Sequence, residues 1–177
     1  MAETSMPTRR LTLMRHGQAA LAPPRATDHQ RQLTEVGVRQ TRALGKQLAL
    51  ERLLPDLVIS SDAERAVLTA RNLLAGAGET RPLLLLSDLY DCNSDEFLAI
   101  VEEVADYSAA HVLVVGHNPS IAIVAEQLAT QSAGSGRVFD DFAPGTAVTF
   151  TVQSEGWQRL GPSSVRLERV HQPTEGT

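Results

Sequence analysis

The sequence lacks the features that several classes of protein require. Cys92 is the only cysteine among 177 residues, which excludes an internal disulfide and a cluster of thiolate metal ligands. No apolar run approaches the length of a membrane-spanning helix, and residues 1–10 hold no apolar core of the kind found in signal peptides. We therefore expect a cytoplasmic protein with no membrane partner.

An excess of positive charge is also missing. The formal net charge is −5, and like charges form no long block. A nucleic-acid-binding protein needs a basic face, so we expect no nucleic-acid partner. Lys46 is the only lysine among 16 basic residues, but this preference for arginine runs through the whole chain and indicates no function.

What is present is typical of one globular domain. Hydrophobic residues make up 42% of the chain and charged residues 21%, and a chain of this length fits a single core. We expect one domain over residues 9–170, a disordered segment over 1–8 and a tail over 171–177. No heptad pattern or conspicuous apolar patch predicts an oligomer, and we expect a monomer.

Short apolar strands alternate with amphipathic helices. Buried strands are predicted where the chain is apolar, at 11–14, 57–61, 83–86 and 112–116. Late strands with hairpin character are predicted at 147–152 and 165–170. The alternation predicts an α/β fold, a three-layer α/β/α arrangement with a mostly parallel central sheet.

Helix boundaries follow from capping residues. Thr34 is the expected N-cap of the first helix, and Ser61 and Glu64 fit a capping box for the second, which glycines 76 and 78 would end. A third helix is expected over 95–107. The fourth would begin with Pro119 at its first helical position, before a long loop over 131–144.

Three strand-to-helix junctions carry polar residues suited to chemistry. They are Arg15-His16-Gly17, the segment from Ser60 to Arg65, and Gly116-His117-Asn118-Pro119. In a parallel sheet such junctions lie at one edge, where α/β proteins bind ligands. Arginine forks bind oxyanions, histidine offers a nitrogen nucleophile, and helix N-termini favour anions. The junctions therefore predict an oxyanion pocket.

The order of these motifs resembles the histidine phosphatase superfamily, whose fold is shared with cofactor-dependent phosphoglycerate mutase. The resemblance covers residues 10–152. The matching segments are Leu13-Met14-Arg15-His16-Gly17, Leu33-Thr34-Glu35-Val36-Gly37, Ser60-Ser61 with Arg65-Ala66 and Thr69-Ala70, and Val115-Gly116-His117-Asn118-Pro119. The chain looks most similar to SixA-type phosphohistidine phosphatases, because the connection from the third strand to the third helix is short. The resemblance thus implies a phosphoglycerate mutase-like fold without a large helical cap.

The resemblance also implies a phosphatase that works through a covalent phosphohistidine intermediate. Neutral His16 would attack phosphorus, while Arg15, Arg65 and protonated His117 would hold the phosphate oxygens. Further candidates for phosphate contacts are Gly17, Asn118 with the amides that follow it, and Arg31. We expect no metal or cofactor, because the guanidinium groups neutralise the charge.

The leaving group separates two classes of substrate. A phosphate ester needs its departing oxygen protonated, and mutase-like relatives use a glutamate shortly after the third strand. Leu89-Tyr90-Asp91 resembles that segment, so Asp91 is the candidate general acid, with a loop or capping carboxylate as the alternative. Asp62 and Glu64 are poorer candidates for the general acid, because helix capping explains both. Phosphohistidine needs less acid help, which favours phosphohistidine of a protein partner over small phosphate monoesters or other small phosphorylated metabolites.

Two other functions compete with this hypothesis. A metal site built from His16, His29 and His117 would lack paired-histidine spacing, and the flanking arginines would repel a cation. A non-catalytic module that binds phosphorylated partners would not need the nucleophile His16. Outside these motifs, we expect His29 to lie in a loop, His111 to begin a strand and Cys92 to be a packed thiol.

Overall fold

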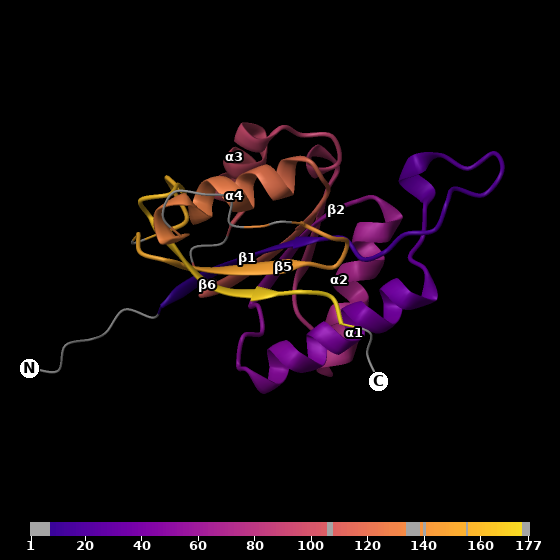
Figure 1. Cartoon of the computed structure of the whole chain (residues 1–177), viewed down its shortest axis with the longest axis horizontal. Coiled ribbons are helices and arrows are strands. Elements are labelled where there is room, and N and C mark those ends of the chain that lie inside the picture. The colour runs from indigo at the N-terminus through magenta and orange to yellow at the C-terminus, as the bar shows by residue number, and fades with distance from the viewer. Residues whose placement is uncertain (1–7, 106–107, 134–138, 140, 155, 175–177) are drawn as a thin grey trace, which may run out of the picture.

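The computed structural model describes residues 8–105, 108–133, 139, 141–154 and 156–174. Within these residues, a six-stranded sheet in the order β3-β2-β4-β1-β5-β6 lies between two pairs of helices (Figure 1). This confirms the predicted three-layer architecture. The disordered segment expected over 1–8 lies outside the described residues except for Thr8, which precedes the first strand.

The sheet is mostly parallel, as predicted. Strand β1 (Arg9–Arg15) pairs in parallel with β4 (His111–Gly116), β4 with β2 (Leu57–Ser61), and β2 with β3 (Leu83–Leu86). Strands β5 (Ala147–Val152) and β6 (Val165–His171) continue the sheet antiparallel. Arg15 pairs with Gly116 at the ends of β1 and β4, so the residues that follow these two strands emerge side by side.

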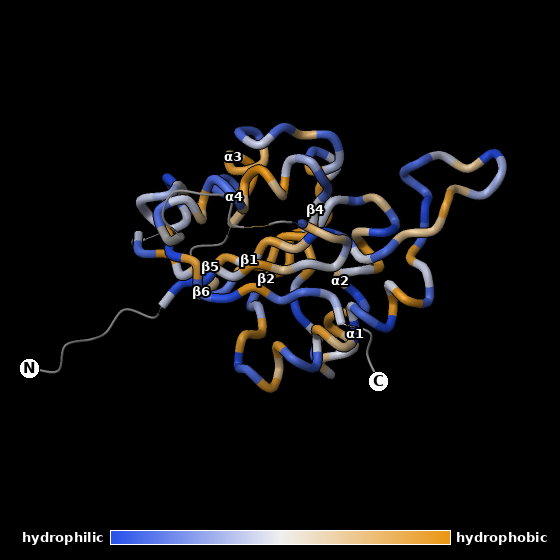
Figure 2. The backbone as a smooth tube through the Cα atoms, viewed as in Figure 1, coloured by the Kyte–Doolittle hydropathy of each residue, from blue (hydrophilic) through white to orange (hydrophobic). Residues whose placement is uncertain are grey.

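Each face of the sheet is covered by two helices. Helices α1 (Glu35–Leu50) and α2 (Glu64–Ala77) cover one face, and α3 (Ser94–Val104) and α4 (Ser120–Ala133) cover the other (Figure 1). Figure 2 shows that hydrophobic residues follow the strands between these layers. Along β1, Leu11 and Leu13 pack into the core with α3 and α4, whereas Met14 packs into the core with α1 and α2. Among the described helices, none is long and apolar enough to cross a membrane.

Close packing of α1 on α2 fixes the helix that carries Arg65. A Cβ atom on Gly45 of α1 would lie 2.0 Å from the Leu73 carbonyl oxygen, and one on Gly76 of α2 would lie 2.2 Å from the Arg42 carbonyl oxygen. Real Cβ contacts are never this short, so both positions require glycine for the helices to approach. Gly76 is therefore a packing residue inside α2, and Gly78, with a φ of 70°, ends the helix.

Several predicted boundaries are wrong. Ala63, not Ser61, is the N-cap of α2, because Ser61 is the last residue of β2 and its hydroxyl lies 2.8 Å from His117 Nε2. Helix α4 begins at Ser120, one residue after Pro119, and extends through the start of the loop expected over 131–144. Helix α3 ends at Val104, and residue 107 lies outside the described residues. Strand β6 includes His171.

The N-cap of α1 is confirmed. The Thr34 hydroxyl accepts a hydrogen bond of 3.0 Å from the Gly37 amide. Two short 3-10 helices lie in the connections around the sheet edge, η1 (Asp28–Gln30) after β1 and η2 (Ser87–Leu89) after β3. The connection from η2 to α3 is short, and no large helical cap is present among the described residues.

Candidate active site

The sheet brings the two histidines of the predicted pocket together. His16 follows β1 and His117 follows β4, and their ring centroids are 5.1 Å apart. Arg65, in the first turn of α2, directs its Nε atom to within 3.3 Å of His16 Nε2. All three side chains are buried. Three junctions that are distant in sequence therefore meet at one edge of the sheet.

The hydrogen bonds of His16 fix its tautomer. Its Nδ1 atom lies 2.8 Å from the Gly17 carbonyl oxygen, and a carbonyl only accepts, so Nδ1 carries the hydrogen. The lone pair is then on Nε2, the atom that faces Arg65. Burial lowers the pKa of His16 to about 4, and the charges of Arg65, Arg15 and Arg31 add to this effect. His16 is therefore a neutral imidazole at pH 7.

His117 is also neutral in this state. Its Nε2 atom lies 2.8 Å from the Ser61 hydroxyl, and its pKa is lowered to about 3 by burial and then by the neighbouring His16 and Arg65. The protonated His117 predicted from the sequence belongs to the phosphate-bound site and stays a prediction; in the free site desolvation disfavours the charged ring. A phosphate dianion beside the ring would raise its pKa again.

Two buried polar atoms of the site lack a partner within the described part of the chain. They are Nε of Arg15 and Nδ1 of His117. The Nη1 atom of Arg15 donates to the Phe142 carbonyl oxygen at 2.8 Å, and burial lowers the pKa of this guanidinium. Unpaired buried polar atoms are costly and rare. Their presence on two predicted phosphate ligands is typical of a pocket that receives an anion.

Asp28 is a site residue that the sequence analysis missed. Its carbonyl oxygen accepts from Arg65 Nη1 at 2.8 Å, and its Oδ2 atom accepts from Arg65 Nη2 at 3.0 Å. The Tyr90 hydroxyl also donates to Oδ2, at 2.8 Å, and Arg31 Nη1 donates to Oδ1 at 3.1 Å. The one available signal was the place of Asp28 three residues before Arg31 in the same loop.

The remaining phosphate-site candidates have other partners in this state. The Gly17 amide donates to the Thr69 hydroxyl at 2.9 Å. Asn118 is exposed, and its Nδ2 atom lies 3.4 Å from the Phe142 carbonyl oxygen. Arg31 donates from Nε to the Ala20 carbonyl oxygen at 2.8 Å. The charge of Arg31 still acts on the site, because it contributes to the lowered pKa of His16.

Asp91, the candidate general acid, lies at the surface. With Asp88, Cys92 and Glu96 it lines a hollow of about 420 Å³, and the described contacts do not join it to His16 or His117. Its neighbour Tyr90 turns inward instead, with a ring centroid 5.4 Å from that of His117. Cys92 is half-buried, and burial raises the pKa of its thiol.

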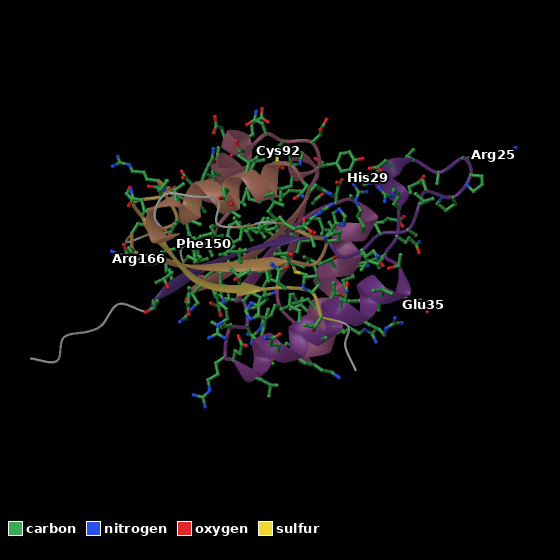
Figure 3. The ribbon with its side chains drawn as sticks, in the orientation of Figure 1. Arg25, His29, Glu35, Cys92, Phe150 and Arg166 are labelled. Carbon is green, nitrogen blue, oxygen red and sulfur yellow. The ribbon has the colours of Figure 1, made fainter. Side chains whose placement is uncertain are left out.

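The histidines outside the pocket have structural partners. His29 lies in the loop that projects beyond β1 (Figure 3), and its Nε2 atom is 2.8 Å from Asp62 Oδ1. His111 begins β4, where its buried Nε2 atom is 2.8 Å from the Thr12 hydroxyl. Among the described residues, no group of three or more His, Cys, Asp or Glu side chains is arranged to hold a metal ion.

The comparisons with known proteins agree with this fold. Residues 11–107 match the histidine phosphatase superfamily (branch 1), and the chain belongs to this superfamily. Curated proteins give no match. Family membership and the similarity to the solved structures described next support the classification of the chain as a phosphatase, a hydrolase of phosphorylated substrates.

The similar solved structures include SixA proteins. The proposed phosphohistidine phosphatase SixA from Nakamurella multipartitia is 32% identical, with a TM-score of 0.78 over 95% of this chain and 98% of that one. Its counterpart from Agrobacterium tumefaciens is 25% identical, with a TM-score of 0.73 over 96% of this chain and 100% of that one. The protein histidine phosphatase SixA in complex with tungstate, at 22% identity and a TM-score of 0.73, shares the fold over 93% of this chain and 97% of its own.

Proposed function

We propose that this chain removes phosphate from phosphohistidine of a partner protein, through a phosphoryl group carried on Nε2 of His16. The observation that supports this most strongly is the orientation of His16. The Gly17 carbonyl holds the proton on Nδ1, so the lone pair is on Nε2, where it accepts a hydrogen bond of 3.3 Å from Arg65 Nε beside the ring of His117. A neutral imidazole with its lone pair on Nε2 is a nucleophile for phosphorus once the incoming phosphoryl oxygens accept the Arg65 Nε–H in its place.

In the first step the Nε2 lone pair of His16 forms a bond to phosphorus as the bond to the leaving group breaks. With phosphohistidine, the leaving imidazole departs with its own proton on the ring, so it needs little help from an acid. With a phosphate ester, the departing oxygen must receive a proton. Asp91 is the proposed donor for that case. An ester substrate would bind with its leaving oxygen next to this surface carboxylate.

Positive charge around the pocket stabilises the transferring group. Nε of Arg15, Nε of Arg65 and Nδ1 of His117 supply donors for the three equatorial oxygens, where negative charge gathers. The neutral His117 of the free site gains its proton as the phosphate dianion arrives. Fixed donors of this kind lower the barrier because they need no reorganisation during the reaction.

In the second step water attacks phosphorus and the bond to His16 Nε2 breaks. Inorganic phosphate leaves with the oxygen and both protons of the attacking water, and the lone pair returns to Nε2 while the proton stays on Nδ1. The Gly17 carbonyl fixes the same tautomer throughout, because Nδ1 keeps its acceptor. His16 is therefore ready for a second turnover without a tautomer change.

Two features favour a protein substrate. The similar structures at 32% and 25% identity are both proposed phosphohistidine phosphatases. In addition, the connection from β3 to α3 is short, and the described residues form no large cap that would obstruct a protein partner at this edge of the sheet. Small phosphate monoesters would not need this open access.

A substrate panel tests the proposal. Phosphohistidine proteins, p-nitrophenyl phosphate, sugar phosphates and nucleotides are assayed side by side with the wild type and with His16→Ala. We expect the highest kcat/KM with a phosphohistidine protein and its loss in His16→Ala. Far better hydrolysis of sugar phosphates would contradict the substrate class, and binding of phosphorylated proteins without turnover would identify a non-catalytic module.

A further inference from the structure

The carboxylate of Asp28 joins three segments of the chain around the pocket. Asp28 itself lies in η1 on the loop after β1, Arg65 in the first turn of α2, and Tyr90 directly after η2. Oδ2 accepts from Arg65 Nη2 at 3.0 Å and from the Tyr90 hydroxyl at 2.8 Å, while Oδ1 accepts from Arg31 at 3.1 Å. One side chain therefore positions parts of the site that come from distant segments.

The Arg65 guanidinium makes different contacts at its Nη1–Nη2 end and at the edge that carries Nε. Its end, formed by Nη1 and Nη2, is held by the carbonyl oxygen and the carboxylate of Asp28. Its side edge carries Nε, which points to His16 Nε2 at 3.3 Å. A guanidinium is planar and rigid, so fixing its end also fixes the direction of Nε.

We propose that Asp28 is a positioning residue for phosphoryl transfer: it holds the end of Arg65 so that the Nε edge, and not the Nη1–Nη2 end, meets the phosphoryl group on His16. Asp28 makes no described hydrogen bond to His16 or His117; its charge partly offsets the lowering of the His117 pKa by burial, and its direct hydrogen bonds to the catalytic candidates go to Arg65. The inference rests on the proposed function, because it assigns the edge of Arg65 that the phosphoryl group meets.

The charge of Asp28 argues against a simple role in phosphate affinity. Hydrogen bonds from Tyr90 and Arg31, together with Arg65, lower the pKa of Asp28 to about 2, so the carboxylate is ionised at neutral pH. A negative charge this close to an incoming phosphate repels it. Its place at the pocket is explained if orientation of Arg65 during the reaction outweighs the loss in ground-state binding.

A second contact of the same loop provides a matched control. The Oδ1 atom of Asp62 lies 2.8 Å from His29 Nε2. This contact also connects the loop to the segment before α2. None of the described contacts of Asp62 involves Arg65. Asp28→Ala and Asp62→Ala each remove one carboxylate that holds the loop, but only the first removes a hydrogen bond to Arg65, the one at Nη2, and leaves Nη1 on the backbone carbonyl oxygen of residue 28.

The direct readout is the Arg65 Nε–H signal in a ¹⁵N NMR spectrum, assigned by its loss in Arg65→Lys. We expect Asp28→Ala to shift the signal and to speed its exchange with water by about 10-fold or more, because one remaining hydrogen bond at Nη1 no longer fixes the plane of the guanidinium. Asp62→Ala should leave the signal in place. An unchanged Arg65 signal in Asp28→Ala would overturn the inference, and thermal unfolding of each variant verifies that it is folded.

Kinetics supply the second readout. In Asp28→Ala, kcat should fall by about 10-fold or more, whereas the Kd of inorganic phosphate should stay equal or decrease, because a repelling charge is removed. A kcat within about threefold of the wild type, or weakening of phosphate binding in parallel with kcat, would overturn the inference. A wild type that hydrolyses no phosphorylated substrate would contradict the proposed function, and the NMR signal would then decide only whether Asp28 fixes the orientation of Arg65.

Discussion

The Nε atom of Arg65 lies 3.3 Å from Nε2 of His16, on the side of the ring that carries the lone pair. An N–H donor is thus aimed at the atom to which we expect phosphorus to bond. Because Arg65 is buried and its other end is held by Asp28, the Nε–H stays beside His16, where it can pass from Nε2 to an oxygen of the incoming phosphoryl group. Substitution of Arg65 therefore tests the proposed chemistry directly.

Arg65→Lys keeps the positive charge and removes the directed Nε–H donor. We expect kcat/KM to fall by about 100-fold, the loss typical of removing one fixed donor to a transition-state oxygen. The exposed Arg71 of the same helix provides the control, and Arg71→Lys should retain wild-type activity. Steady-state kinetics with p-nitrophenyl phosphate measure both. Full activity of Arg65→Lys would mean that charge alone is sufficient.

Much of the fold could be predicted from the sequence. The apolar runs that became β1, β2, β3 and β4 are short and end in polar junctions, so their number and parallel order followed from the alternation with helices. Helix ends were less predictable. Ser61 has the residue type of a cap, but its hydroxyl contacts His117, and this tertiary contact cannot be deduced from local sequence.

In the site, too, the residues placed by strand order could be predicted, whereas those placed by contacts between side chains could not. His16, His117, Arg15 and Arg65 were predicted because each lies at or just after the end of a strand at the ligand-binding edge. Asp28 was missed because it lies in a loop, and the path of that loop back to Arg65 depends on contacts between side chains. The protonation of His117 was also unpredictable, since burial and the neighbouring His16 set its pKa.

Buried histidines should make the fold less stable in mild acid. The pKa of His111 is lowered to about 4, mainly by burial, and those of His16 and His117 are lowered as well. As pH falls below 6.5, the unfolded chain binds protons at these positions and the folded chain does not. The free energy of unfolding should therefore decrease as pH falls from 6.5 towards 5.

Urea unfolding at several pH values measures this effect in the wild type and in His111→Gln. Each histidine of this kind contributes a slope of at most about 1.4 kcal/mol per pH unit, so the variant should show a shallower dependence than the wild type. The difference should vanish above pH 7, where both states are neutral at this position. Equal slopes for the two proteins would contradict a neutral buried His111.

Asp91→Asn separates the two substrate classes. If Asp91 protonates the oxygen of a leaving alcohol, hydrolysis of a phosphate ester should fall by about 100-fold or more and lose its limb at high pH. Hydrolysis of phosphohistidine should change little, because the imidazole leaves already protonated. Asp88→Asn, which lines the same surface hollow, is the control. Equal losses on both substrates would show that Asp91 is not a leaving-group acid.

The most direct test of the account is the site of the covalent intermediate. The wild type and His16→Ala are mixed with a ³²P-labelled phosphohistidine protein, quenched in alkali, and digested for mass spectrometry under conditions that avoid acid. The account predicts an acid-labile phosphate on Nε2 of His16 in the wild type, no label on the chain in His16→Ala, and turnover in that variant reduced by about 1000-fold or more. Phosphate on His117 or on Nδ1 of His16, or full turnover without any labelled histidine, would contradict it.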